Sequence, residues 1–282
     1  MLKINIAGVP EHFNYPWIQS IQNGLFQYVG MDVQWTNVPE GTGKLCQLLR
    51  EGSTDVAIVL TEGILKDISL GNPSVIVQKY VESPLLWGIH VAADSSYYNL
   101  ADLQYKKAAI SRIGSGSQLM AYVNAHNQGW DNTIPFEIVH TIDGAVDALS
   151  AQKADYFMWE HFMTKPLVDQ GIFRRLADCP TPWPCFVVAV RKAFLEEHSE
   201  AIKQLLIGIN HQTQSIKQEA NLAQDIAQQY QLKPQDAAAW LEQTNWSQHN
   251  FDQKEFESIQ VQLNHFSILA STLDFESTIH TV

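Results

Sequence analysis

Residues 31–60 have the sequence MDVQWTNVPEGTGKLCQLLREGSTDVAIVL, which predicts a strand, a helix and a second strand in succession. Its first part, residues 31–38, has the composition and alternation of a strand. The turn at residues 39–43 opens a helix, and EGSTD at residues 51–55 ends it. Residues 56–60, VAIVL, are continuously apolar, as in a strand that is buried on both faces. The stretch is therefore a β-α-β unit, which is typical of α/β proteins.

The same pattern extends in both directions from this unit. Residues 2–9 predict a first strand, and apolar residues at helical spacing follow it as far as Gly30, so β-α-β-α-β is complete by residue 60. A second, shorter series has strands at 108–111, 136–139 and 155–158 and helices at 115–126 and 142–152. Alternation of this kind predicts that each series builds a mostly parallel sheet.

Two extended segments link the two series. Residues 74–91 form a long extended pattern that Pro84 interrupts, and we place the first crossing between domains near residues 86–88. The sequence PTPWPC at 180–185 forbids a helix and leads into a strand at 186–190, so it is the predicted return crossing. Beyond Arg191 the chain is predicted to be helical, at about 193–219, 220–231, 234–244 and 253–270.

We therefore expect an α/β fold with two lobes, a hinge of two crossing segments, and C-terminal helices that pack on the first lobe. Lobe 1 is discontinuous and comprises residues 1–87 and 189–282, whereas lobe 2 comprises residues 88–188. Ligands of such folds bind at the carboxyl ends of strands and the N-termini of helices. The cleft between the lobes is accordingly the expected binding site.

Composition argues against several classes of function. With 18 Lys and Arg against 30 Asp and Glu, the net charge is −12. Nucleic-acid binding by counterion release needs clustered positive charges, so DNA and RNA are not expected as partners. The three cysteines, Cys46, Cys179 and Cys185, are expected to be thiols, although Cys179 and Cys185 could pair. They form no CxxC, and the histidines lack metal-ligand spacing, so we expect no metal and no cofactor. Because GxSxG is absent too, we assign no catalytic residue.

The sequence also bears on location. No run approaches the roughly 18 apolar residues that a membrane-spanning helix needs, so direct membrane insertion is not expected. The first residues, MLKINIAGVPEHF, contain no apolar signal-peptide region and no cleavage site. We expect a cytoplasmic protein, or a periplasmic one if a signal sequence has been removed.

Polar residues follow the strands of the first series. Glu11, His12 and Asn14 follow the first strand, and Thr61 and Glu62 follow the third. His12 could carry a proton or donate to a ligand, or it could be a surface histidine. For Thr61 and Glu62, the alternative to ligand contact is helix capping. We expect these residues to face the cleft.

Two glycine-containing turns precede predicted helices, one in each series. Free backbone N–H groups at such a helix start can bind an anionic or carbonyl group of a ligand. The alternatives are a plain turn in the first case and helix capping by serine in the second. The candidate contacts at these turns are Gly41, Thr42, Gly43, Ser115, Gly116 and Ser117.

Three tryptophans and one glutamate complete the candidate site. Trp159 and Glu160 follow the last strand of the second series, where Trp159 could stack on a planar ligand and Glu160 could accept a hydrogen bond. Trp87 and Trp183 flank the two crossings and could line the ligand site. Core packing is the alternative for each tryptophan.

Several phrases of the sequence carry a family resemblance. They include LLREG at 48–52 followed by DVAI at 55–58, SRIGSGS at 111–117, and ADYFMWE at 154–160. In these phrases the chain resembles the type II periplasmic-binding-protein superfamily over roughly residues 2–245. The resemblance is to the NMT1/THI5-like branch that binds sulfonates, taurine and thiamine-pyrimidine precursors. TPWPCF at 181–186 resembles a group without signal peptides that is found in bacteria and fungi.

The resemblance implies a solute-binding protein, similar to the substrate-binding proteins of ABC transporters, that closes two lobes over a small polar or aromatic metabolite. The ligand would be sulfonate-like or similar to a thiamine-pyrimidine precursor. From the candidate residues we expect it to carry both acceptor and donor groups. A permease partner is left open, because members linked to transporters are exported. The alternative is a cytoplasmic enzyme with the same fold, of the thiamine-precursor or menaquinone-pathway type.

Overall fold

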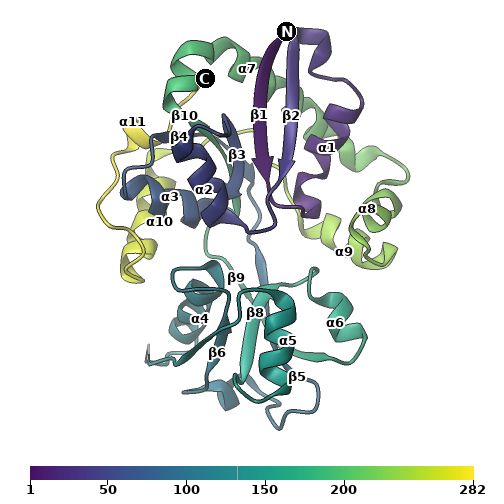
Figure 1. The fold of residues 1–282 in the computed structure, drawn as a ribbon, viewed down its shortest axis with the longest axis vertical. Coiled ribbons are helices and arrows are strands. Elements are labelled where there is room, and N and C mark those ends of the chain that lie inside the picture. Colours follow the sequence, from purple (N-terminus) through teal and green to yellow (C-terminus); the bar gives the residue numbers. More distant parts are fainter. Residues whose placement is uncertain (132) are drawn as a thin grey trace. The chain divides into compact units, whose positions relative to one another are not determined.

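The computed structural model describes residues 1–131 and 133–282, and the chain divides into two compact units. Unit 1 comprises Met1–Ser83 and Trp183–Val282, and unit 2 comprises Pro84–Pro182. The chain passes between the units at residues 83–84 and 182–183, whereas the sequence pattern places these points at 87–88 and 188–189. Each unit has its own sheet (Figure 1).

Unit 1 is built on a five-stranded sheet of order β2-β1-β3-β10-β4 (Figure 1). Its strands are β1 (Leu2–Gly8), β2 (Met31–Asn37), β3 (Val56–Leu60), β4 (Ser74–Val81) and β10 (Phe186–Arg191). β1 pairs in parallel with β2 and β3, but β10 lies antiparallel between β3 and β4. The expectation of a mostly parallel sheet therefore needs correction at β10. Its first residue, Phe186, pairs with Leu60 at the end of β3, so the returning chain must run in the reverse direction.

The middle of this sheet is buried on both faces. All residues from Val56 to Val59 are buried, as are those from Phe186 to Val190, which agrees with their continuous apolar sequence. Gln78 and Lys79 of β4 are buried as well, and C-terminal helices supply partners for both side chains. The Gln78 amide is hydrogen-bonded to that of Asn210, and the Lys79 ammonium pairs with the Glu255 carboxylate at 2.9 Å.

The helices of unit 1 come from both of its chain segments. They are α1 (Tyr15–Gln22), α2 (Thr42–Glu51), α3 (Thr61–Ser69), α7 (Lys192–Ser215), α8 (Leu222–Tyr230), α9 (Pro234–Gln243), α10 (Gln253–His265) and α11 (Phe275–Thr278). The first helix is shorter than predicted, because the chain leaves the helical conformation at Gly24, whose φ is +70°. The apolar spacing continues to Gly30, but residues 27–29 form only a 3-10 turn. None of the helices in the described part of the chain is long and apolar enough to cross a membrane.

Unit 2 repeats the strand arrangement of unit 1, with order β7-β6-β8-β5-β9. Its strands are β5 (Leu86–Ala92), β6 (Ala108–Ile110), β7 (Phe136–Ile138), β8 (Tyr156–Glu160) and β9 (Phe173–Pro180). β6 pairs in parallel with β7 and β8, and β5 lies antiparallel between β8 and β9. Residues 86–88 therefore lie within a strand of unit 2 and not in a crossing segment.

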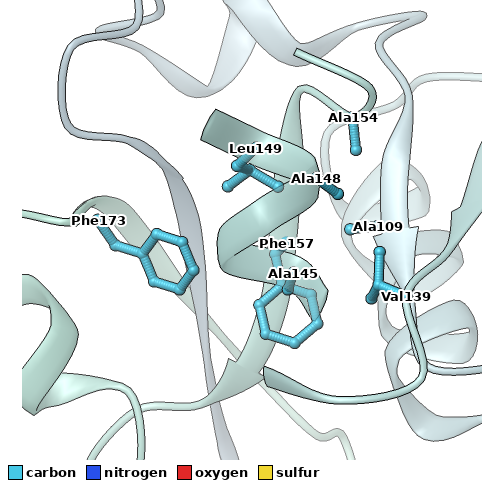
Figure 2. Close-up of a cluster of buried hydrophobic side chains, with 8 residues drawn as sticks. All are labelled: Ala109, Val139, Ala145, Ala148, Leu149, Ala154, Phe157 and Phe173. Carbon is cyan, nitrogen blue, oxygen red and sulfur yellow. The ribbon is translucent and has the colours of Figure 1, made fainter. Parts of the chain in front are cut away.

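The helices of unit 2 are α4 (Gly116–Asn127), α5 (Ile142–Ser150) and α6 (Lys165–Asp169). Figure 2 shows a buried cluster in which α5 lies against Phe157 of β8 and Phe173 of β9. The small side chains of Ala145 and Ala148 allow this close packing. Gly144 is also required, since a Cβ at this position would lie 2.0 Å from the Val139 carbonyl oxygen. Tight helix-to-sheet packing thus fixes the loops at the ends of these strands.

In each unit, three neighbouring parallel strands end at the same edge of the sheet. In unit 1 these are β1, β2 and β3, and in unit 2 they are β6, β7 and β8. The polar residues singled out in the sequence therefore gather at one sheet edge in each unit.

Candidate functional site

In unit 1, the start of α3 is tied to the segment that precedes β10. The Thr61 backbone N–H donates to the Cys185 carbonyl at 3.0 Å, and the Thr61 hydroxyl donates to the Pro184 carbonyl at 2.5 Å. These bonds hold Pro184 and Cys185 beside the first turn of the helix. Thr61 is fully buried, and its hydroxyl is used to position this segment.

Glu62 occupies the first turn of α3 and is only 4% exposed. The Trp183 indole N–H donates to its Oε2 at 2.8 Å. Within the described part of the chain, Oε1 has no hydrogen-bond partner, and no ion pair involves Glu62. Burial raises the pKa of Glu62 to about 7, although its own backbone N–H and, to a smaller extent, the bond from Trp183 act in the opposite direction. Glu62 is thus a buried carboxyl with one oxygen held and the other unsatisfied.

Three more titratable groups interact electrostatically with Glu62 or with one another. Burial raises the pKa of the Cys185 thiol well above its usual range, and the charges of Glu62 and Glu11 add to the effect. Burial also raises the pKa of Glu11 to about 7, although Glu11 is partly exposed. The pKa of Tyr230 on α8 is raised by burial and, to a smaller extent, by Tyr15 and Glu11. We refer to Glu11, Glu62, Trp183, Cys185 and Tyr230 as the Glu62 cluster.

His12 lies near Tyr230 of this cluster, with 6.0 Å between ring centroids, and both His12 and Asn14 are buried. The His12 ring packs edge-on against Trp240, with 4.4 Å between ring centroids, and stacks on Phe13 at 5.0 Å. Burial lowers the pKa of His12 to about 3, so the ring is neutral at pH 7, with one N–H donor and one acceptor nitrogen. The Asn14 amide donates to the Val9 carbonyl at 2.9 Å, which shapes the loop after β1.

The turn before α2 contributes mainly packing. Gly41 has a φ of +80° and lies directly before the helix. Thr42 packs on Gly63, where an added Cβ would lie 2.1 Å from the Thr42 Cγ2 atom. Gly43 is exposed. Ligand contact by these residues remains a prediction.

In unit 2, the serines before and within α4 form a connected network. Ser115 is the N-cap and its hydroxyl accepts from the Gln118 N–H. The Ser117 hydroxyl accepts from the Ser111 N–H at 3.0 Å and is hydrogen-bonded to the Ser115 hydroxyl at 3.0 Å. Ser117 is only 2% exposed. The capping alternative is therefore present, and a bulky residue at position 117 would disturb the loop as well as any ligand contact.

Trp87 lies against the start of α4. A Cβ on Gly116 would be 3.0 Å from its Cη2 atom, so glycine allows the indole to approach the helix N-terminus. Trp87 is 5% exposed, and its Nε1–H has no acceptor among the described residues. Trp159 meets Trp87 edge-to-face at 6.1 Å and stacks on Phe157 at 5.4 Å. The helix start thus has an additional, unsatisfied donor beside it.

The sequence pattern places Trp159 and Glu160 after the strand, but both residues lie inside β8. The Glu160 carboxylate accepts from the Met163 N–H at 2.6 Å and is 4% exposed, so it stabilises the loop that follows the strand. In the same loop the Thr164 hydroxyl is hydrogen-bonded to His90, whose pKa burial lowers to about 3. Glu160 is therefore already engaged by its own loop.

No local pattern in the sequence identifies Cys185 as a neighbour of Glu62, or Tyr230 and Trp240 as neighbours of His12. Tyr230 and Trp240 come from C-terminal helices with no local signal for a site. All three cysteines are buried thiols in the structure. The described residues contain no group of three or more His, Cys, Asp or Glu side chains placed to bind a metal ion.

Comparisons with known proteins identify relatives that share this fold. A family profile described as "Ca3427-like PBP" matches residues 87–179, which lie in unit 2. Among solved structures, the Candida albicans CA3427 gene product is 26% identical and superposes with a TM-score of 0.92, covering 100% of this chain and 97% of that chain. It defines a family that exhibits the generic periplasmic binding protein fold. The chain is a type II periplasmic-binding-protein superfamily member that resembles the Ca3427 group.

Two sulfonate-binding proteins share the fold. The alkanesulfonate-binding protein SsuA of Xanthomonas axonopodis pv. citri, bound to MOPS, has a TM-score of 0.84 at 16% identity, covering 100% of this chain and 99% of that chain. The periplasmic aliphatic sulphonate-binding protein SsuA of Escherichia coli has a TM-score of 0.77 at 16% identity, covering 100% and 92%. No curated protein sequence matches the chain. The fold class predicted from the sequence is confirmed.

Proposed function

We propose that the protein binds a small molecule reversibly, as a solute-binding protein. The observation that carries the proposal is Glu62, a 4% exposed carboxyl whose Oε1 has no hydrogen-bond partner in the described residues. A buried polar atom without a partner costs about 1–3 kcal/mol, and a ligand donor would remove that cost. The solute-binding fold of the structural relatives supports the same role.

Unit 2 supports a complementary interaction. The N-terminus of α4 attracts acceptor groups, and the unsatisfied Nε1–H of Trp87 lies beside it. A sulfonate-like or carbonyl group is the kind of acceptor that such donors bind. The proposed solute therefore carries both donor and acceptor groups. Closure of the units on the ligand is part of the proposal, and a smaller radius of gyration in the presence of ligand would support it.

The test is mass spectrometry of small molecules that the purified protein retains from a metabolite extract. The comparison includes Glu62→Gln and, as a matched control, Glu242→Gln, which changes an exposed carboxylate on α9. We expect a chemically unchanged compound on the wild type and on Glu242→Gln, with much less on Glu62→Gln. A transformed compound would favour the enzymatic alternative, and the absence of any retained compound would overturn the proposal.

A further inference from the structure

We infer that the group of the solute that contacts Glu62 is a positively charged nitrogen group, such as an ammonium or amidinium, and not a sulfonate. The inference rests on the proposed function and specifies the ligand class for one site within unit 1. It starts from the difference between the two oxygens of the Glu62 carboxyl. The Trp183 indole N–H satisfies Oε2, whereas Oε1 has no donor among the described residues.

A carboxylate with this burial needs a compensating donor. Glu62 is only 4% exposed, and an ionised carboxylate in such surroundings is unfavourable unless it is paired. Buried carboxylates elsewhere in the same unit do have partners: Asp55 pairs with Arg191 at 3.0 Å and accepts from the Asn5 N–H at 2.9 Å. Glu62 lacks a comparable cation, so the missing donor is of the type that a ligand can bring.

The charges around Glu62 select the sign of the ligand. Glu11 is a second carboxyl near the same Cys185 thiol, and the pKa of this thiol is raised by burial and by both carboxyls. Neither carboxyl has an ion pair with a described lysine or arginine. A buried carboxylate with a second, partly exposed carboxylate in the same region attracts a cation and repels an anion. This part of unit 1 is therefore unsuited to the sulfonate group that the SsuA proteins bind.

Hydrogen-bond strength gives the expected size of the effect. A charge-assisted hydrogen bond between an N–H cation and a carboxylate contributes enough to change affinity by about 10- to 100-fold. Trp183, whose indole N–H is bonded to the same carboxyl, would supply apolar contacts to that group. A cation on a small aromatic scaffold is consequently a suitable probe.

The experiment measures binding of four probes that differ only in their polar group: benzamidine, benzylamine, benzyl alcohol and benzenesulfonate. The proteins are the wild type, Glu62→Gln, Glu11→Gln and the control Glu242→Gln, each checked for folding by circular dichroism. Ligand-detected NMR and calorimetry give the affinities. We expect the two cations to bind the wild type and Glu242→Gln in the millimolar range or tighter. Glu62→Gln should bind them about 10- to 100-fold more weakly.

Several results would overturn the inference. They are no binding of either cation to the wild type, equal binding to Glu62→Gln, or a preference for benzenesulfonate that Glu62→Gln abolishes. If Glu62→Gln does not fold, unchanged cation binding by Glu11→Gln would have the same consequence. The proposed function fails separately, since it requires a compound retained from the extract. A retained compound without a cationic nitrogen would leave solute binding intact and refute only the ligand class.

Discussion

Replacement of Glu62 by glutamine should change how the stability of the protein depends on pH. Burial raises the pKa of Glu62 to about 7 from 4.5, so the unfolded chain ionises at lower pH than the folded protein. A group with a raised folded pKa contributes stability below its unfolded pKa and loses it as pH rises through its folded pKa. Glutamine cannot ionise, so Glu62→Gln should lack this loss.

The magnitude follows from the shift. Each pKa unit corresponds to about 1.4 kcal/mol, so the change from 4.5 to about 7 corresponds to about 3 kcal/mol between pH 4.5 and pH 8.5. Over this range the wild type should lose about 3 kcal/mol of unfolding free energy relative to Glu62→Gln. Any constant effect of the substitution cancels in this difference.

The assay is urea denaturation of both proteins in steps from pH 4.5 to pH 8.5, followed by tryptophan fluorescence and analysed by linear extrapolation. Glu242→Gln, an exposed replacement of the same type, should run parallel to the wild type. Parallel profiles for the wild type and Glu62→Gln would show that Glu62 is not a strained buried carboxyl. That result would remove the basis for its role in ligand binding.

Two further predictions concern the loops at the sheet edges. Gly63→Ala should destabilise the protein by about 1–3 kcal/mol, because its Cβ would lie 2.1 Å from Thr42 Cγ2, and adding Thr42→Ser should restore most of the loss in a double-mutant cycle. Additive effects would contradict the packing argument. Ser117→Ala should cost about 1–3 kcal/mol in urea denaturation, because the Ser111 N–H loses its acceptor. Ser96→Ala, at an exposed position, should have little effect, and an equally small loss for Ser117→Ala would refute the loop network.

The alternation of strands and helices was predictable because its signals are local. Apolar runs such as 56–60 and the serine before α4 specify their elements without reference to the rest of the chain. Glu62 could be chosen from the sequence because it follows a strand, and the ends of parallel strands share an edge. Its environment could not be predicted. Trp183 lies 121 residues away along the chain, and only the folded sheet brings its N–H to the carboxyl.

Three features of the fold differ from the prediction for physical reasons. The apolar spacing after α1 continues past Gly24, so periodicity alone extends the helix beyond its true end. β9 escapes prediction because polar and charged residues, including Arg174 and Arg175, interrupt its apolar pattern. The reversed direction of β10 depends on where the returning chain enters the sheet, which no local pattern encodes.

Whether Glu62 binds a cationic group is tested most directly by infrared difference spectroscopy. The carboxyl C=O stretch is recorded at pH 7 as benzamidine is added. Because the pKa of Glu62 is about 7, part of the population is protonated before the probe binds. Binding of the cation should ionise Glu62, so the band of the protonated carboxyl should decrease more in the wild type than in Glu62→Gln. An identical decrease in the two proteins, or no decrease in the wild type, would contradict it.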